Sequence, residues 1–101
     1  MKINAAFIFV APDVDSTKHR TVIETPGISL HVIGVSSYSE GEMVAKEMVE
    51  NGVGAIELCA GFGNEGIARI ARAVDGKAFI GAVKFDFHPG LGFKSGDELF
   101  Q

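Results

Sequence analysis

The segment VGAIELCAGFGNEG, residues 53–66, decides the fold that the sequence predicts. Its first half is mostly apolar, and its second half holds three glycines around Asn64, a residue type that often caps a helix. Apolar residues at helical spacing follow as far as Asp75-Gly76, where the helix is expected to stop. A strand that turns directly into a helix is the repeating unit of parallel sheets, so the sequence predicts an α/β protein.

Three more extended segments are expected besides the strand in this stretch. INAAFIFVA (residues 3–11) is almost continuously apolar, as a strand covered on both faces is. ISLHVIGVSS (residues 28–37) is rich in β-branched and apolar residues, which also favour a strand. KAFIGAVKFDFH (residues 77–88) follows the last predicted helix and supplies another strand. The sequence therefore predicts a sheet of four strands.

The connections between these strands are predicted to be helices. One covers residues 15–24 and ends at a Thr-Pro-Gly sequence, because the residue before a proline avoids helical geometry. The second covers residues 40–51, with Ser39 as its cap and Asn-Gly as its left-handed stop, and the third covers residues 64–75. The order β-α-β-α-β-α-β predicts a small, mainly parallel sheet with helices on both faces.

The C-terminal segment PGLGFKSGDELFQ, residues 89–101, is predicted to be an extended tail because it has neither helical nor strand periodicity. Its large apolar residues Phe93, Leu99 and Phe100 are expected to dock on this subunit or on a neighbouring one. Four strands are few for a free-standing sheet, so the protein is predicted to form a homo-oligomer.

Composition limits the classes of protein that fit. The 101 residues are 47% hydrophobic, which predicts a single domain over residues 1–101. A net charge of −4 with nine scattered Lys and Arg residues predicts no nucleic-acid partner. The apolar N-terminal run is too short to span a bilayer, so no membrane partner is predicted. The single cysteine excludes an intrachain disulfide, and a cytoplasmic location is expected.

Ligands of open parallel sheets bind beyond the carboxyl ends of the strands, where helix N-termini point their free N–H groups. This rule predicts a site for a small polar or anionic molecule, held by N–H groups of the glycine-rich loop. The predicted ligand-binding residues are Asp13, Gly61, Phe62, Gly63, Asn64 and Lys84.

Residues of the third and fourth predicted strands form a candidate catalytic set. Glu57 and Lys84 are expected to pair, because a carboxylate in the middle of an apolar strand is costly unless it is neutralised. The same alternation brings Cys59 near His88, with Asp86 beside them, if the faces of the two strands coincide. A thiol at a helix N-terminus with an imidazole base suits proton transfer next to a carbonyl. The alternative is that Cys59 is a packed apolar group and His88 begins the following turn.

A nucleotide site is a further alternative. Gly61, Gly63 and Gly66 match the spacing G-x-G-x-x-G, and Asp86 lies about 20 residues further along, as the dinucleotide fingerprint requires. Glu65 in the first helical turn would repel a pyrophosphate, and a tight turn explains the glycines without a ligand. No cofactor is identified. The thiol, imidazole and carboxylates match no zinc spacing, so no metal is predicted.

The sequence thus leaves three functions open. The first is a small-molecule binding or proton-transfer site at the carboxyl edge of the sheet. The second is a noncatalytic oligomeric module for binding or assembly, and the third is nucleotide binding through the loop at residues 61–66. Whether the protein is an enzyme is not decided by these patterns.

The chain resembles a small microbial family known only as a domain of unknown function. The resemblance covers nearly the whole chain and is carried by five stretches: NAAFIFVAPD, HRTVIETPG, AIELCAGFG, KFDFHPG and KSGDELF. It implies no established activity, substrate or catalytic residue, so it does not choose among the three functions.

Overall fold

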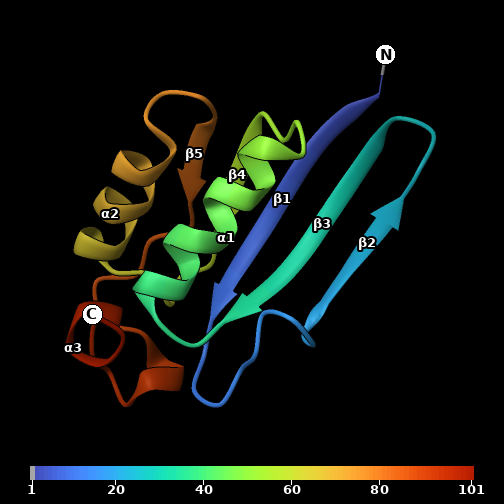
Figure 1. Cartoon of the computed structure of the whole chain (residues 1–101). Helices are drawn as coiled ribbons and strands as arrows, with labels where there is room; N and C mark the ends of the chain where they lie inside the picture. The colour runs from blue at the N-terminus through green and yellow to red at the C-terminus, as the bar shows by residue number, and fades with distance from the viewer. Residues whose placement is uncertain (1) are drawn as a thin grey trace.

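A computed structural model describes residues 2–101 of the chain (Figure 1). Its strands are β1 (Ile3–Val10), β2 (Arg20–Glu24), β3 (Ile28–Val35), β4 (Ala55–Leu58) and β5 (Phe79–Ala82). Its helices are α1 (Tyr38–Glu50), α2 (Asn64–Val74), the 3-10 helix η1 (Pro89–Leu91) and α3 (Gly96–Leu99). The prediction of one domain over residues 1–101 stays a prediction, and Met1 lies outside the described residues.

All five strands belong to one sheet, in the order β2-β3-β1-β4-β5. β1 is parallel to both of its neighbours, β3 and β4, and β4 is parallel to β5. β2 is antiparallel to β3 and lies at the edge. The predicted α/β class with a mainly parallel sheet is therefore confirmed, although the sheet has one strand more than expected.

The predicted helix over residues 15–24 is wrong. Residues 20–24, RTVIE, form β2, which pairs with β3 through a short hairpin at Thr-Pro-Gly. Three consecutive β-branched residues disfavour a helix because their side chains are restricted against the preceding turn, and they favour a pleated strand. The hairpin partner then fixes the choice, since β3 offers an otherwise unpaired edge.

Both long helices lie on the same face of the sheet, so the prediction of helices on both faces is wrong (Figure 1). The chain passes from β3 through α1 to β4, and from β4 through α2 to β5, and both steps move in the same direction along the sheet. Crossovers of one hand that step in one direction must place their helices on one side. The connection from β1 to β3 contains β2 in place of a helix, so no helix is available for the second face.

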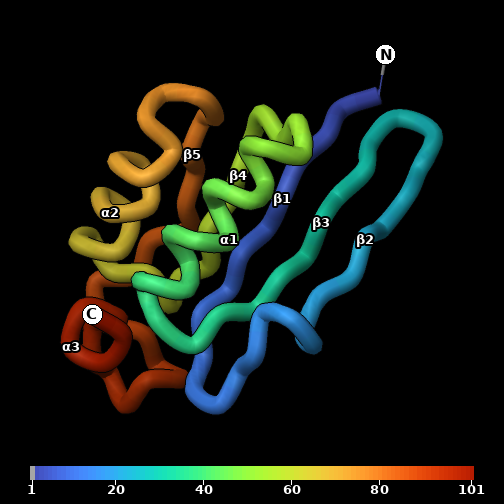
Figure 2. The backbone as a smooth tube through the Cα atoms, in the orientation of Figure 1, coloured from blue at the N-terminus to red at the C-terminus, as the bar shows by residue number. Residues whose placement is uncertain are grey.

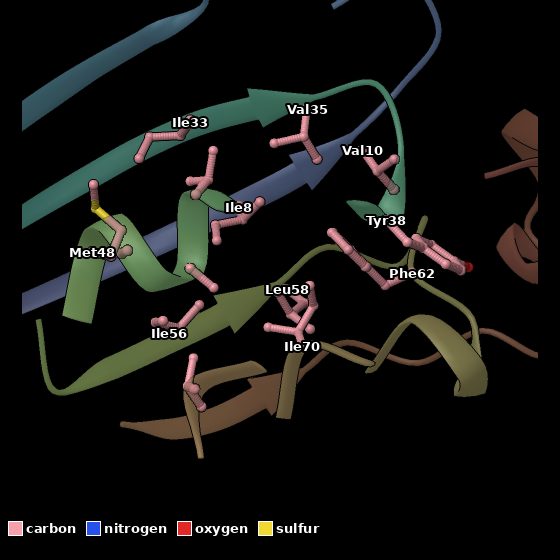
Figure 3. Close-up of a cluster of buried hydrophobic side chains, with 14 of the residues drawn as sticks. Ile8, Val10, Ile33, Val35, Tyr38, Met48, Ile56, Leu58, Phe62 and Ile70 are labelled. Carbon is pink, nitrogen blue, oxygen red and sulfur yellow. The ribbon is translucent and has the colours of Figure 1, made fainter. Parts of the chain in front are cut away.

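The hydrophobic core fills the space between the sheet and the two long helices (Figure 3). Alternate residues of the central strands point into it, among them Ile8 from β1, Ile33 from β3 and Leu58 from β4, which are almost fully buried. Met48 of α1 and Ile70 of α2 close it from the helix side. This alternation follows from the period of two along a strand.

The opposite side, which we call the uncovered sheet face, carries the other alternate residues of each strand. The register places the odd-numbered residues of β1, β2, β4 and β5 there, together with the even-numbered residues of β3. Glu57 is the single charged residue that the five strands place on this face. Its apolar members are Ile3, Ala5, Phe7, Phe9, Ile23, Ile28, Leu30, Val32, Ala55 and Phe79.

The predicted boundaries of the two long helices are correct to within two residues. α1 begins after Ser37, whose side chain accepts a hydrogen bond from the N–H of Glu40, so Ser37 is the cap in place of Ser39. After the end of α1, Gly52 has a φ of 86°, which supports the predicted left-handed stop. Among residues 2–101, no helix has both the length and the apolar character required to cross a membrane.

The C-terminal region is folded, so the prediction of an extended tail is wrong. The fourth predicted strand ends at Ala82, and the chain then leaves the sheet and continues through η1 and α3 to the carboxyl edge, where the C-terminus lies (Figure 2). α3 has a capping box formed by Ser95 and Glu98. Phe100 docks in the core of its own chain, whereas Phe93 and Leu99 remain exposed.

Candidate functional site

The glycine-rich loop between β4 and α2 lies at the carboxyl edge, against the C-terminal residues of the same chain. A Cβ atom on Gly96 would lie 1.8 Å from the carbonyl oxygen of Gly61, and one on Gly63 would lie 2.4 Å from the Asp97 carboxylate. A Cβ atom on Gly66 would lie 2.5 Å from the Tyr38 ring. These glycines permit close approach, and none of the three in the loop has a positive φ.

Asp97 caps the N-terminus of α2 from outside that helix. Its carboxylate accepts hydrogen bonds from the N–H groups of Glu65 at 3.0 Å and Gly66 at 3.2 Å. The residue that precedes α2 is Gly63, which has no side chain to provide a cap, so the predicted cap by Asn64 is wrong. A carboxylate at this position satisfies free N–H groups and interacts favourably with the helix dipole.

Tyr38 connects the first turn of α1 to this cap. Its hydroxyl donates to Asp97 Oδ1 at 2.8 Å and accepts from the N–H of Gly63 at 3.0 Å. The ring stacks on Phe62 with a centroid separation of 5.6 Å, and both side chains are fully buried. Burial raises the pKa of Tyr38 far above its usual 10.0, so the hydroxyl stays protonated and keeps donating to Asp97.

N–H groups of the loop that were predicted to bind a ligand have hydrogen-bond partners within the chain. The N–H of Gly61 points at Cys59 Sγ, and those of Gly63, Glu65 and Gly66 donate to Tyr38 or Asp97. The expected anion position at α2 is thus filled by a carboxylate of the chain itself. Phe62, predicted to contact a ligand, has no exposed surface. The same contacts explain the G-x-G-x-x-G spacing without a nucleotide.

Cys59 and His88 have separate partners. The sulfur of Cys59 lies 3.5 Å from the N–H nitrogen of Val10 and 3.3 Å from that of Gly61, in a partly buried position beside the core. The His88 ring packs on Phe85 at 5.1 Å, and its Nδ1 accepts from the N–H of Gly90 at 2.9 Å. Within residues 2–101 no hydrogen bond joins the thiol to the imidazole.

The predicted pair between Glu57 and Lys84 is wrong. Glu57 of β4 lies opposite Gly81 of β5 on the uncovered sheet face. The odd-numbered residues of β4 and β5 therefore share this face, and the even-numbered Lys84 does not belong to that set. Lys84 pairs with Asp86 instead, and this hydrogen bond lowers the pKa of the Asp86 carboxyl. Because the chain leaves the sheet after Ala82, alternation along a strand no longer determines where residues 84–88 point.

A pocket of 320 Å³ lies at the carboxyl edge, beside the N-terminus of α2, and we call it the carboxyl-edge pocket. Three of its residues were predicted from the sequence: Asn64, Lys84 and Asp86. Residues 84–87 also line a more open hollow of 590 Å³, together with Pro89 and Phe93. The carboxyl-edge pocket is lined by Asn64, Lys84, Phe85, Asp86, Phe87 and Ser95.

Asp13 lies outside this pocket. It follows β1 in an exposed turn and has a φ of 59°, a conformation that Asp tolerates better than most residues. In the part of the chain from residue 2 onward, no group of three or more His, Cys, Asp and Glu side chains is arranged to hold a metal ion.

The fold and the site together define a class: an α/β protein whose mainly parallel sheet carries its long helices on one face and a small pocket at its carboxyl edge. A family model described as a family of unknown function, DUF6506, matches residues 3–98, and the chain belongs to this family. The resemblance noted from the sequence is thereby confirmed. Searches of curated proteins and of solved structures each found no match.

Two residues that organise this edge were not among the predicted site residues. Asp97 and Tyr38 were not singled out, although Tyr38 is the only tyrosine in the chain. One signal was present: Ser95 and Glu98 have the spacing of a capping box, which predicts a helix start in the supposed tail. The contact of Asp97 with α2 had no such signal because it joins residues about 30 positions apart.

Proposed function

We propose that this protein binds a small organic anion with an apolar body in the carboxyl-edge pocket. The observation that supports this function is the composition of the pocket wall: one lysine, one aspartate and two neutral polar residues lie beside two aromatic residues. Cationic and polar groups suit a carboxylate, and exposed aromatic rings suit the apolar part of the same molecule.

The electrostatics of Lys84 fit this proposal. Its ammonium group is paired with Asp86, and both side chains are well exposed. Such a pair between neighbouring residues contributes little to stability, so a ligand carboxylate can replace Asp86 at low cost. Asp86 then turns to solvent, or holds a basic group if the ligand carries one. The anion is therefore placed at Lys84 and not at the N-terminus of α2, where Asp97 is bound.

The aromatic residues support an apolar contact. Phe85 is 45% exposed and Phe87 is 65% exposed, although both belong to a short segment between two folded elements. Large exposed aromatic groups that gather at a pocket are typical of ligand sites. We propose binding in preference to catalysis because Cys59 and His88 lie outside this wall and have partners of their own. A cytoplasmic location stays a prediction.

A titration followed by NMR tests the proposal. The probes are benzoate, phenylacetate and hexanoate at millimolar concentration, with benzamide as an uncharged control. We expect amide shifts at Asn64, Phe85 and Phe87 with the carboxylates, and weaker ones with benzamide. Lys84→Ala is expected to weaken binding about tenfold, because it removes the charge-assisted contact.

Lys77→Ala is the matched control for this experiment. Lys77 lines another surface pocket, of 290 Å³, between the C-terminal ends of α1 and α2, and that pocket has no aromatic residue. Its substitution should leave carboxylate binding unchanged. Absence of localised shifts with all three carboxylates, or equal loss of binding in both lysine variants, would contradict the proposed function.

A further inference from the structure

The uncovered sheet face is the largest feature that the proposed ligand site does not use. Its apolar side chains include Phe79, which is 86% exposed, Ile3 at 58% and Ile23 at 50%. On the other face the corresponding residues Ile8 and Ile33 are at most 1% exposed, because the helices cover them. We propose that the uncovered sheet face is a homodimer interface, on which a second copy of this chain packs its own uncovered face.

The size of the face meets the requirement of a dimer. Five strands about 4.8 Å apart, averaging about six residues of about 3.3 Å each, give a flat area of roughly 470 Å². Protruding side chains make the accessible area larger than this projection. Two copies would therefore bury about 1,000 Å² or more in total, which is the lower bound for a specific interface. An apolar patch of this size is within the range of about 300–600 Å² found for the largest patch of a monomer, which often has a function.

The face carries an exposed aromatic ring close to a position that has no side chain. Phe79 protrudes from β5, and two residues further along the same strand Gly81 leaves a recess, where an added Cβ atom would meet only Glu57 Cγ at 4.0 Å. In a twofold contact the same patch meets itself in the opposite direction. The Phe79 ring of one copy can then enter the Gly81 recess of the other, and the reverse contact forms at the same time.

A second copy fits this face better than a partner of different chemistry. A twisted sheet packs most closely on another sheet of the same twist, which an identical chain supplies. The face has no charge pattern that a different partner would recognise, since Glu57 is its single charged strand residue. Glu57 lies on β4, next to the edge strand β5, so its carboxylate can reach the solvated rim of a dimer.

Sedimentation velocity on the full chain tests this inference. We expect a species of twice the chain mass at micromolar concentration. Phe79→Glu should produce a monomer with an unchanged circular dichroism spectrum, because an exposed side chain on the subunit is replaced. The matched control is Met43→Glu, which changes another exposed apolar residue, 70% exposed on α1, and should leave the dimer intact.

A second variant tests the recess itself. Gly81→Leu adds a side chain where the single subunit has room, so the subunit should stay folded. It fills the position that Phe79 of the other copy would occupy, and the dimer dissociation constant should rise about tenfold or more, because the Phe79 ring loses its contact.

Three results would overturn the inference. One is a wild-type chain that remains monomeric at high micromolar concentration. This result counts against the inference even if the monomer binds a different protein through this face. Another is an oligomer that both Phe79→Glu and Gly81→Leu leave unchanged. The third is dissociation by Met43→Glu to the same extent. None of these depends on the carboxylate titration, so the two proposals succeed or fail separately.

Discussion

At the carboxyl edge, the close approach of two backbone segments restricts which residue can occupy a single position. Gly96 of α3 lies against Gly61 of the β4–α2 loop so tightly that no Cβ atom fits between them. This contact places Asp97 on the N-terminus of α2 and Phe100 in the core. The glycines are therefore required for packing. Their spacing resembles a nucleotide-binding motif because close packing and phosphate binding both need backbone without side chains next to the start of a helix.

Gly96→Ala is expected to lower the free energy of unfolding by about 2–3 kcal/mol, because the added methyl group meets a backbone carbonyl that cannot move independently. Urea denaturation followed by circular dichroism measures the change. Gly27→Ala is the control, since a Cβ atom there has open space and the residue does not have a positive φ. That variant should change stability by less than about 0.5 kcal/mol. Equal effects would refute the tight contact.

At the scale of elements, side chains at one edge of the sheet bind backbone groups of segments distant in sequence. α3 supplies Asp97 to the start of α2, whose preceding residue is a glycine. The turn before β2 is fixed to the start of α1 by Glu40, which accepts hydrogen bonds from the N–H of Ser36 at 2.6 Å and of Ser16 at 3.1 Å. Elements distant in sequence thus satisfy each other's backbone groups at one edge of the sheet.

The Glu40 contacts predict a dependence of stability on pH. Desolvation opposes ionisation, but the hydrogen bonds from Ser36 and Ser16 outweigh it and hold the pKa of the Glu40 carboxyl below its usual 4.5. A lowered pKa in the folded state contributes stability above pH 4.5, and this stability is lost as the pH falls through the folded-state value.

Glu40→Gln should therefore lower the free energy of unfolding by about 1 kcal/mol at pH 7, a value reduced for partial exposure. The difference from wild type should shrink as the pH is lowered below 4.5, because the wild-type carboxyl becomes neutral. Urea denaturation at a series of pH values measures it. Glu50→Gln, an exposed position on the same helix, is the control. A constant difference across the series would contradict the assignment.

At the scale of the whole molecule, the chain forms a layer of helices and a layer of sheet, and it leaves the second face of the sheet without a layer (Figure 1). Domains are usually built so that each apolar face is covered by another element. Here the helices cover one face only, and on the other face the Val14 side chain of the β1–β2 connection occupies the space beside Gly34. The remaining face is the physical reason to expect association of two copies, and it lies apart from the carboxyl-edge pocket proposed for a ligand.

A dimer makes thermal stability depend on concentration, because unfolding then also separates two chains. A tenfold increase in protein concentration should raise the Tm of the wild type by about 3 °C, given the usual entropy of unfolding per residue. The Tm of the monomeric Phe79→Glu variant should not change. Differential scanning calorimetry at two concentrations measures both, and a wild-type Tm that is independent of concentration would count against the dimer.

The sequence by itself determined the α/β class, the parallel strands β1, β3 and β4, and the two long helices, because apolar periodicity and helix stops are local signals. It also indicated the family and three residues of the pocket, Asn64, Lys84 and Asp86, because the carboxyl ends of parallel strands meet at one edge.

Only the tertiary structure decided the rest, because it depends on contacts between distant residues. β2 is a strand since β3 offers it a partner, and Glu57 and Lys84 are apart because the register sets Glu57 against Gly81. The cap of α2 by Asp97 joins residues about 30 positions apart that no local pattern connects. The uncovered sheet face likewise follows from the direction of two crossovers, which is a property of the assembled sheet.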